Sequence, residues 1–175
     1  MEKKSIDRTL IIPKGVSINL DGNLMKVKGP KGEIERRFAF KNVNFNLSEN
    51  KIIITSKKNS RKFKKIVNSF YSHITNMLWG IQNSYTYKLK VCSGHFPMKV
   101  TQDKDNILIS NFLGEKIPRK AAILQGVSVK LDSDTITLTG ADKEATAQSA
   151  ANIEMATKIT KRDRRVFQDG IFLMK

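Results

Sequence analysis

The sequence predicts an α+β protein built from two tandem, similar units, each a small antiparallel sheet packed against one helix. LMKVKGPKGEIERRF (Leu24 to Phe38) runs from an alternating segment through a glycine-bearing turn into a charged strand, and ILISNFLGEKIPRK (Ile107 to Lys120) repeats this order. Further on, KIIITSKKNSRKFKKIV resembles DTITLTGADKEATAQSAA at an offset of about 82 to 84 positions. These repeats indicate an internal duplication of units that are each small for an independent core.

The first unit is expected to place its strands before its helix. Residues 1–13 form a short arm in which Leu10-Ile11-Ile12 can pack. Alternating apolar and polar residues predict strands over 16–20, 24–28, 33–38, 43–47 and 51–55. Asn59 or Ser60 then caps a long helix, whose apolar residues recur three and four positions apart from Phe63 to Ile81. One face of this helix therefore covers the sheet.

The second unit is expected to repeat this order. Its predicted strands are 98–101, 107–110, 127–131, 135–139 and a terminal strand over 171–174. Asp142 caps a helix that runs to about Lys158, and its alanine-rich packing face lets the helix lie close to its sheet. Phe112 and Leu113 stand at a hairpin tip, where polar residues are usual. We therefore expect these two side chains to pack under the other unit.

The junction between the units is expected at Ser93-Gly94, after a strand from Tyr85 to Cys92 that follows the first helix. This gives a first unit over residues 1–92 and a second over 93–175. An alternative interpretation is that Tyr85 to Val100 forms two long strands that bridge both sheets.

The charge balance indicates a polyanionic partner. The 175 residues include 32 Lys and Arg against 16 Asp and Glu, a net charge of +16 that opposes compaction by self-repulsion. Most of the excess, +13, falls in residues 1–90, which hold 19 basic and 6 acidic residues. One cysteine, no apolar run of membrane-spanning length and no signal-like amino terminus lead us to expect a soluble protein in a reducing, intracellular compartment.

Two groups of cations stand at the two predicted helices. The first group, at the start of the first helix, is Lys57, Lys58, Arg61, Lys62, Lys64 and Lys65. These cations face the positive end of the helix dipole, so either they contact phosphate or they form a solvated basic face. The second group, after the second helix, is Lys158, Lys161, Arg162, Arg164 and Arg165. Helix capping explains part of this charge, phosphate contact is the alternative use, and Asp163 and Asp169 can orient Arg164 or Arg165.

Motifs for catalysis, nucleotide binding and metal binding are absent from the sequence. There is no G-x-x-x-x-G-K-[ST], C-x-x-C or H-E-x-x-H, and the G-x-x-G at Gly29 to Gly32 joins strands instead of the two helices of a KH domain. Cys92, His73 and His95 lack a third ligand, so we expect structural histidines. The aromatic residues Tyr85, Tyr87, Phe96 and Phe112 are expected in the core. We therefore expect no enzyme, no metal and no cofactor.

Four segments resemble a known family. HFPMKV (His95 to Val100), NFLGEKIPRKA (Asn111 to Ala121), ADKEATAQSAANIEMATKITKRDRRVFQDGIF (Ala141 to Phe172) and VKGPKGE (Val27 to Glu33) look like the sixth universal protein of the large ribosomal subunit. They are most similar to its archaeal and eukaryotic branch. The resemblance implies a duplicated α+β protein whose second unit is the main ribosomal RNA contact near the sarcin–ricin loop. It implies that the first unit lies toward the stalk base and its neighbouring ribosomal proteins, where translation factors dock.

The resemblance also implies a function and a set of contacts. The implied function is a non-catalytic constituent of the large ribosomal subunit in the cytoplasm, assembled in the nucleolus if the cell is eukaryotic, that supports the elongation-factor region. The alternative is a free-standing RNA chaperone or translation regulator. The implied phosphate contacts are Lys116, Arg119, Lys120, Lys158, Lys161, Arg162, Arg164 and Arg165, with the cations of the first helix as a secondary RNA or protein contact. No membrane and no small-molecule substrate are expected.

Overall fold

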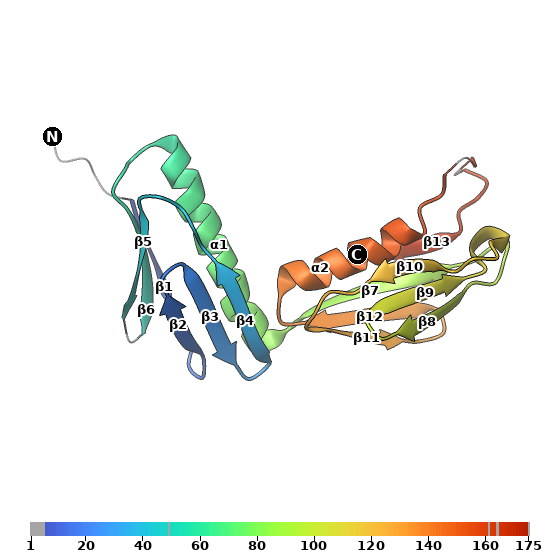
Figure 1. Cartoon of the computed structure of the whole chain (residues 1–175), viewed down its shortest axis with the longest axis horizontal. Coiled ribbons are helices and arrows are strands. Elements are labelled where there is room, and N and C mark those ends of the chain that lie inside the picture. The colour runs from blue at the N-terminus through green and yellow to red at the C-terminus, as the bar shows by residue number, and fades with distance from the viewer. Residues whose placement is uncertain (1–5, 49, 161, 164, 175) are drawn as a thin grey trace. The chain divides into compact units, whose positions relative to one another are not determined.

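Figure 1 shows the computed structural model of the chain, which describes residues 6–48, 50–160, 162–163 and 165–174. The chain divides into two compact units, Met1–Ser84 and Tyr85–Lys175. Each unit combines one long helix with antiparallel strands, so the α+β class and the internal duplication are confirmed.

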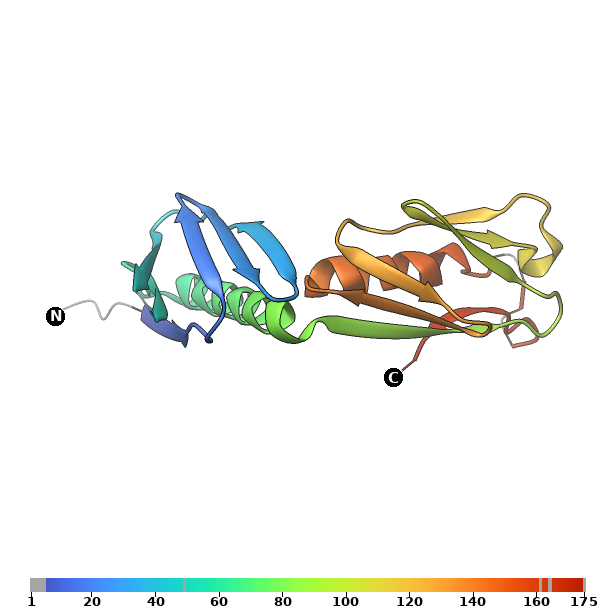
Figure 2. The same cartoon turned by 90° about the horizontal axis from the view of Figure 1, so that it is seen from below.

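The first unit packs one helix on two three-stranded antiparallel sheets. Its elements are β1 Ile6–Ile11, β2 Ser17–Asp21, β3 Leu24–Gly29, β4 Gly32–Arg37, β5 Val43–Ser48, β6 Lys51–Ser56 and α1 Arg61–Asn83. The sheets have the orders β1-β6-β5 and β2-β3-β4, and α1 contacts strands of both (Figure 2). Val67, Ile74 and Ile81 of the apolar stripe of α1 are fully buried, as the spacing predicts, while members such as Phe63 and Ile66 are half-buried. The segment expected to be an arm is partly an edge strand, because residues 6–11 pair with β6.

The second unit has the same construction with one more strand. Its elements are β7 Tyr85–Cys92, β8 Lys99–Asp103, β9 Asn106–Ser110, the 3-10 turn η1 Phe112–Gly114, β10 Arg119–Ala122, β11 Val127–Leu131, β12 Thr135–Gly140, α2 Lys143–Ala156 and β13 Gly170–Leu173. The sheets have the orders β10-β9-β8 and β11-β12-β7-β13. Asp142 caps α2 by accepting a hydrogen bond from the Glu144 N–H at 2.9 Å, as expected. The helix lies against strands of both sheets.

The pairing orders show the duplication in the topology. The order β1-β6-β5 corresponds to β7-β12-β11, and β2-β3-β4 corresponds to β8-β9-β10, while β13 is an addition in the second unit. The strands of each unit are thus shared between two hydrogen-bonded sheets, where the sequence analysis expected one.

The boundary between the units differs from the expected junction at residues 92 and 93. The structure divides the chain after Ser84, because β7 pairs with β12 and β13 and so belongs entirely to the second unit. Strand β7 is the counterpart of β1, the first strand of the first unit. Residues 85–100 are not two strands that bridge the units, since β7 and β8 lie in the two sheets of the second unit.

Phe112 and Leu113 do not pack under the other unit. Phe112 is fully buried and Leu113 is 9% exposed, and both belong to the core of their own unit. Asn111 and Leu113 adopt left-handed backbone angles, with φ of 59° and 50°. These angles turn the apolar tip of the β9–β10 connection inward. Phe96, expected in the core, is instead 40% exposed.

Candidate nucleic-acid interface

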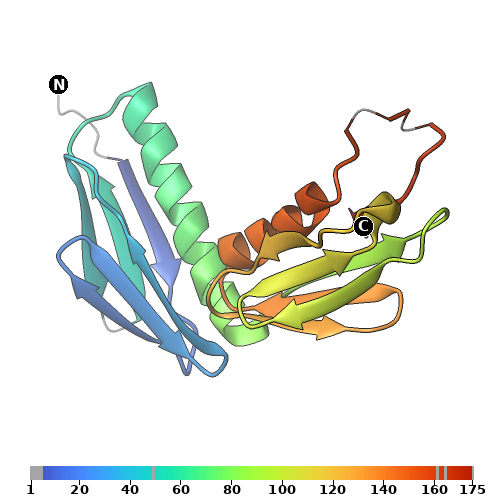
Figure 3. The same ribbon diagram turned by 45° about the vertical axis from the view of Figure 1, so that its right-hand side comes forward.

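The cations predicted as phosphate contacts are distributed over several elements of the second unit. Lys116 lies after η1, Arg119 and Lys120 lie on β10, and Lys158, Arg162 and Arg165 lie in the connection from α2 to β13. All are exposed except Arg119, which is half-buried. Lys161 and Arg164 fall outside the described residues. Figures 1 and 3 show the described parts of the α2–β13 connection extending beyond the end of α2.

Arg119 is bonded within its own unit on three sides. Its Nε and Nη2 atoms donate to the two carboxylate oxygens of Glu115, with the Nε distance at 2.8 Å. Its Nη1 donates to the backbone oxygens of Ala156 at 2.9 Å and Lys158 at 3.2 Å, and its guanidinium lies 4.3 Å from the centre of the Phe112 ring. The hydrogen bond from Arg119 holds the pKa of Glu115 below its ordinary value, against a smaller rise from desolvation. Most of the donors of Arg119 are therefore already used.

The C-terminal end of α2 is capped by Arg119 from another element. The sequence predicts part of this role for the cations that follow the helix, but the last turn of α2 contains no basic residue. The bond from Arg119 to the Ala156 carbonyl satisfies a group that the helix leaves unpaired, and its bond to the Lys158 carbonyl fixes the chain two residues beyond the helix. The side chains of Lys158, Arg162 and Arg165 make no hydrogen bond to α2 within the part of the chain that the structure describes.

Arg119 and Lys120 lie on opposite faces of their sheet. Consecutive residues of a strand point to opposite sides, and the register pairs Arg119 with Ile109 and Lys120 with Leu108. Arg119 faces α2, whose last residue, Ala156, it binds through the backbone carbonyl. Lys120 therefore belongs to a different face from the cations that follow α2.

Two cations of the α2–β13 connection are held in defined orientations. Arg165 donates to Asp163 from its backbone N–H, Nε and Nη2 at 2.9, 3.2 and 3.0 Å, and the Arg162 guanidinium lies 4.8 Å from the centre of the Phe167 ring. The hydrogen bonds from Arg165 lower the pKa of Asp163, and the Asp163 carboxylate raises the pKa of Arg165. Asp163 thus orients Arg165, as the sequence analysis proposed.

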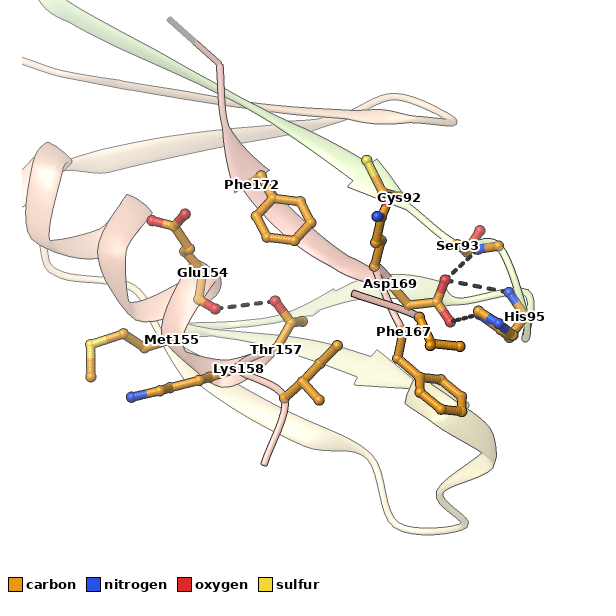
Figure 4. A pocket seen from close by; sticks show the side chains of 14 residues that line it. Cys92, Ser93, His95, Glu154, Met155, Thr157, Lys158, Phe167, Asp169 and Phe172 are labelled. Carbon is orange, nitrogen blue, oxygen red and sulfur yellow. Dashed lines mark hydrogen bonds and ion pairs between the residues drawn. The ribbon is translucent and has the colours of Figure 1, made fainter. Parts of the chain in front are cut away.

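Asp169 ties this connection to the loop between β7 and β8. Its carboxylate, 3% exposed, accepts hydrogen bonds from the backbone N–H groups of Gly94 and His95, and lies 3.0 Å from His95 Nδ1 (Figure 4). Burial raises the pKa of Asp169, but the bonds from Gly94 and His95 outweigh it, so the net pKa lies below the ordinary value. His95 is structural, as expected, whereas Asp169 binds this loop and not an arginine. Sequence spacing could not show this pairing, since the two residues are 74 positions apart.

The cation group of the first unit is exposed at the start of α1. Ser60 occupies the N-cap without a side-chain hydrogen bond, and the first turn of α1 contains no acidic residue. Lys62 lies 6.0 Å from the centre of the Phe40 ring. In the part of the chain that the structure describes, none of the six cations forms an ion pair with an acidic side chain. Their charge is therefore not neutralised by the acidic side chains that the structure describes.

Metal sites and membrane spans have no support in the residues that the structure describes. The described ranges contain no group of three His, Cys, Asp or Glu side chains able to hold a metal ion. Within those ranges, no helix has the length and apolar character needed to cross a membrane.

Comparison with known proteins identifies the family. The family model for ribosomal protein L6 matches residues 12–84 and 96–170, one segment in each unit. The chain belongs to the ribosomal protein L6 family. Large ribosomal subunit protein uL6 of Methanospirillum hungatei is 41% identical over 170 residues, 97% of either chain. The protein of the same name from Saccharolobus solfataricus is 44% identical over 165 residues, 94% of this chain and 91% of the relative.

Membership of the L6 family confirms the resemblance carried by the four sequence segments. The first matched segment of the L6 model ends at residue 84, where the two units divide, which agrees with a duplicated fold. A further archaeal member, from Aeropyrum pernix, is 42% identical over 163 residues, which is 93% of this chain.

Proposed function

We propose that this chain is a structural constituent of the large ribosomal subunit that binds ribosomal RNA through exposed cations, with its second unit as the main contact. The observation that carries this proposal is the similarity, at about 40% identity over nearly the full length of both chains, to proteins named as large-subunit components. The surplus of positive charge supports it, because a structural RNA can neutralise the self-repulsion of a chain with a net charge of +16.

The proposed mechanism is electrostatic and based on shape. Exposed Lys and Arg side chains neutralise phosphates, and the sheets of each unit fix the spacing of those side chains. The cations that lie exposed for this role are Lys116, Lys120, Lys158, Arg162 and Arg165, and Lys161 and Arg164 are proposed on sequence grounds. Arg119 would support these phosphate contacts indirectly, by holding the end of α2 and the β9–β10 connection together. No bond is made or broken, so no enzymatic step is proposed.

The resemblance to the family also indicates which regions of the large subunit each unit contacts. We place the second unit near the sarcin–ricin loop and the first toward the stalk base, where it would support the region that elongation factors use. The six cations at the start of α1 would then form a secondary RNA or protein contact. The site of action is the cytoplasmic large subunit, with nucleolar assembly if the cell is eukaryotic.

Fractionation of a cell extract on a sucrose gradient tests the assignment to the subunit. A stoichiometric component co-migrates with large subunits at physiological salt. A free-standing RNA chaperone or translation regulator would remain mostly near the top of the gradient, and that result would contradict the proposal.

Charge reversal tests which unit makes the main contact. We expect Arg162→Glu with Arg165→Glu to weaken binding of the full chain to a ribosomal RNA fragment containing the sarcin–ricin loop. The matched pair Lys64→Glu with Lys65→Glu should weaken it less. For each phosphate that a variant no longer neutralises, the slope of log affinity against log salt should become shallower by about 0.7 to 0.9. The opposite order of the two pairs would move the main contact to the first unit, and a flat salt response of the unaltered chain would exclude phosphate-dominated binding.

A further inference from the structure

A hollow of about 970 Å³ opens in the second unit where α2 ends and β13 begins. It is lined by the end of β7, the following loop, the last turn of α2 and the residues that lead into β13 (Figure 4). Of the described cations proposed above as phosphate contacts, only Lys158 lines this hollow. Its size is within the range of sites that enclose a small organic group.

Large apolar side chains line the hollow while remaining accessible. Phe172 is 41% exposed, Met155 is 67% exposed and Val166 is 60% exposed. The Phe172 ring lies against Gly170, since a β-carbon added at Gly170 would lie 2.9 Å from the ring. An accessible aromatic ring beside other exposed apolar groups is typical of a surface that a partner covers.

The floor of the hollow is held by buried hydrogen bonds. Asp169 fixes the loop at Gly94 and His95, as described above. Thr157, also buried, donates from its hydroxyl to the Glu154 carbonyl at 3.1 Å and accepts from the Ile171 N–H at 2.9 Å, which joins the end of α2 to β13. The hollow is therefore preformed, and a ligand would not have to order it.

The groups that line the hollow suit a ligand that carries a phosphate, a flat apolar face and hydrogen-bond donors. Lys158 lines it, and Arg162 lies over Phe167, another lining residue. Among the lining acids, Asp169 is already bonded to the neighbouring loop, which leaves Glu154 as the exposed carboxylate. A nucleotide combines a phosphate for the cations with a base whose face can stack on an aromatic ring and whose amino or imino groups can donate to a carboxylate.

We propose that this hollow receives one unstacked nucleotide of the bound RNA, with its base on the Phe172 ring, its edge toward Glu154 and its phosphate toward Lys158. The inference rests on the proposed function and deepens it, because it adds an ordered base contact to binding by phosphate neutralisation. Stacking of a base on an aromatic ring tolerates several bases, so the structure assigns a nucleotide site without naming the base.

Substitution of Phe172 separates stacking from charge. With the full chain and the same ribosomal RNA fragment, Phe172→Leu should weaken binding by about five- to a hundredfold, because the base can no longer stack on an aromatic side chain. Phe172→Tyr keeps the ring and should bind within about twofold of the unaltered chain. The slope of log affinity against log salt should be unchanged in both, since no phosphate contact is removed. Leu173→Ala is the matched control, because Leu173 is 44% exposed on the same strand and does not line the hollow.

Cys92 offers a second measurement, since it lines the hollow and is the single cysteine of the chain. Bound RNA should slow alkylation of Cys92 by iodoacetamide in the unaltered chain. The slowing should be reduced in Phe172→Leu when RNA is added to the same occupancy. Far-ultraviolet circular dichroism shows that the variants remain folded before either comparison is made.

The outcomes separate this inference from the proposed function. If the unaltered chain binds the RNA fragment with a steep salt response but Phe172→Leu binds equally well and Cys92 stays reactive, the nucleotide site is overturned and the proposed function stands. If Phe172→Leu impairs incorporation into subunits without changing affinity for RNA, a protein neighbour covers the hollow and the inference is again overturned. If the unaltered chain binds no ribosomal RNA, both are overturned.

Discussion

Arg119→Ala should destabilise the second unit far more than a substitution at a phosphate-binding cation would. The side chain is 26% exposed and joins three parts of the unit, namely Glu115, the Phe112 ring and the end of α2. An arginine that only awaited RNA would be replaceable at little cost to stability, because exposed substitutions usually change the free energy of unfolding by less than about 0.5 kcal/mol. The two roles therefore make different predictions for the protein without RNA.

The magnitude follows from the separate contacts. The two hydrogen bonds to the carbonyls of Ala156 and Lys158 contribute about 1.5 kcal/mol each at the low end of the range for charged donors, because this helix end is partly solvated. Stacking on Phe112 adds about 0.5 to 1 kcal/mol, and the exposed pair with Glu115 adds less than about 1 kcal/mol. Since water replaces part of these bonds, we expect a net loss of about 2 to 4 kcal/mol, or roughly 10 °C or more in Tm for a unit of this size.

Urea denaturation followed by circular dichroism measures the loss. Arg119→Lys, which keeps the charge but cannot bind Glu115 and both carbonyls together, should lose about half as much. Lys120→Ala is the control, since it removes an exposed cation from the neighbouring position on the opposite sheet face. If Arg119→Ala unfolded within about 0.5 kcal/mol of the unaltered chain and instead lost RNA affinity tenfold, the structural role would be refuted.

Two further substitutions test the packing and the buried carboxylate. Asp169→Asn should cost about 1 to 3 kcal/mol at pH 7. The depressed pKa of Asp169 contributes stability above about pH 4 that is lost as the pH falls through the folded-state pKa. The difference in unfolding free energy between the variant and the unaltered chain should therefore shrink in acid. A constant difference from pH 7 to pH 2 would exclude this cause. Gly29→Ala should cost about 1 to 3 kcal/mol, because its β-carbon would meet Cγ2 of the buried Ile81 well inside van der Waals contact. In a double-mutant cycle with Ile81→Ala the losses should be less than additive, and strict additivity would contradict a direct clash.

The local elements could be predicted because each depends on short-range chemistry. Alternation identified most strands, although it missed β1, and the apolar spacing from Phe63 to Ile81 identified α1 to within two residues of either end. The unit boundary could not be predicted in this way, because it depends on the pairing of β7 with β12 and β13 far along the chain. Phe112 and Leu113 were misplaced because left-handed backbone at a residue other than glycine has no sequence signal strong enough to detect.

The candidate site, like the fold, could be predicted only in part. Clusters of Lys and Arg are visible in the sequence, and they identify which residues can meet phosphate. Their partners are not visible, since Arg119 binds carbonyls 37 and 39 positions away and Asp169 binds a loop 74 positions away. The hollow beside Phe172 is a product of these long-range contacts, and no motif in the sequence indicates it.

The proposal that the second unit makes the main RNA contact runs against the distribution of total charge. Most of the net charge lies in residues 1–90. In the described part of the chain, however, the cations at the start of α1 have no acidic partner to orient them. Each Lys fixed by a phosphate would therefore lose about 1.5 to 2 kcal/mol of rotamer entropy. In the second unit, Arg162 rests on Phe167 and Arg165 is held by Asp163, so part of that entropy is already lost in the free protein. Binding by these preorganised cations should therefore gain more affinity per charge. The diffuse charge of the first unit would act over a longer range and speed the encounter with RNA, so reversal at Arg162 and Arg165 should affect affinity more strongly.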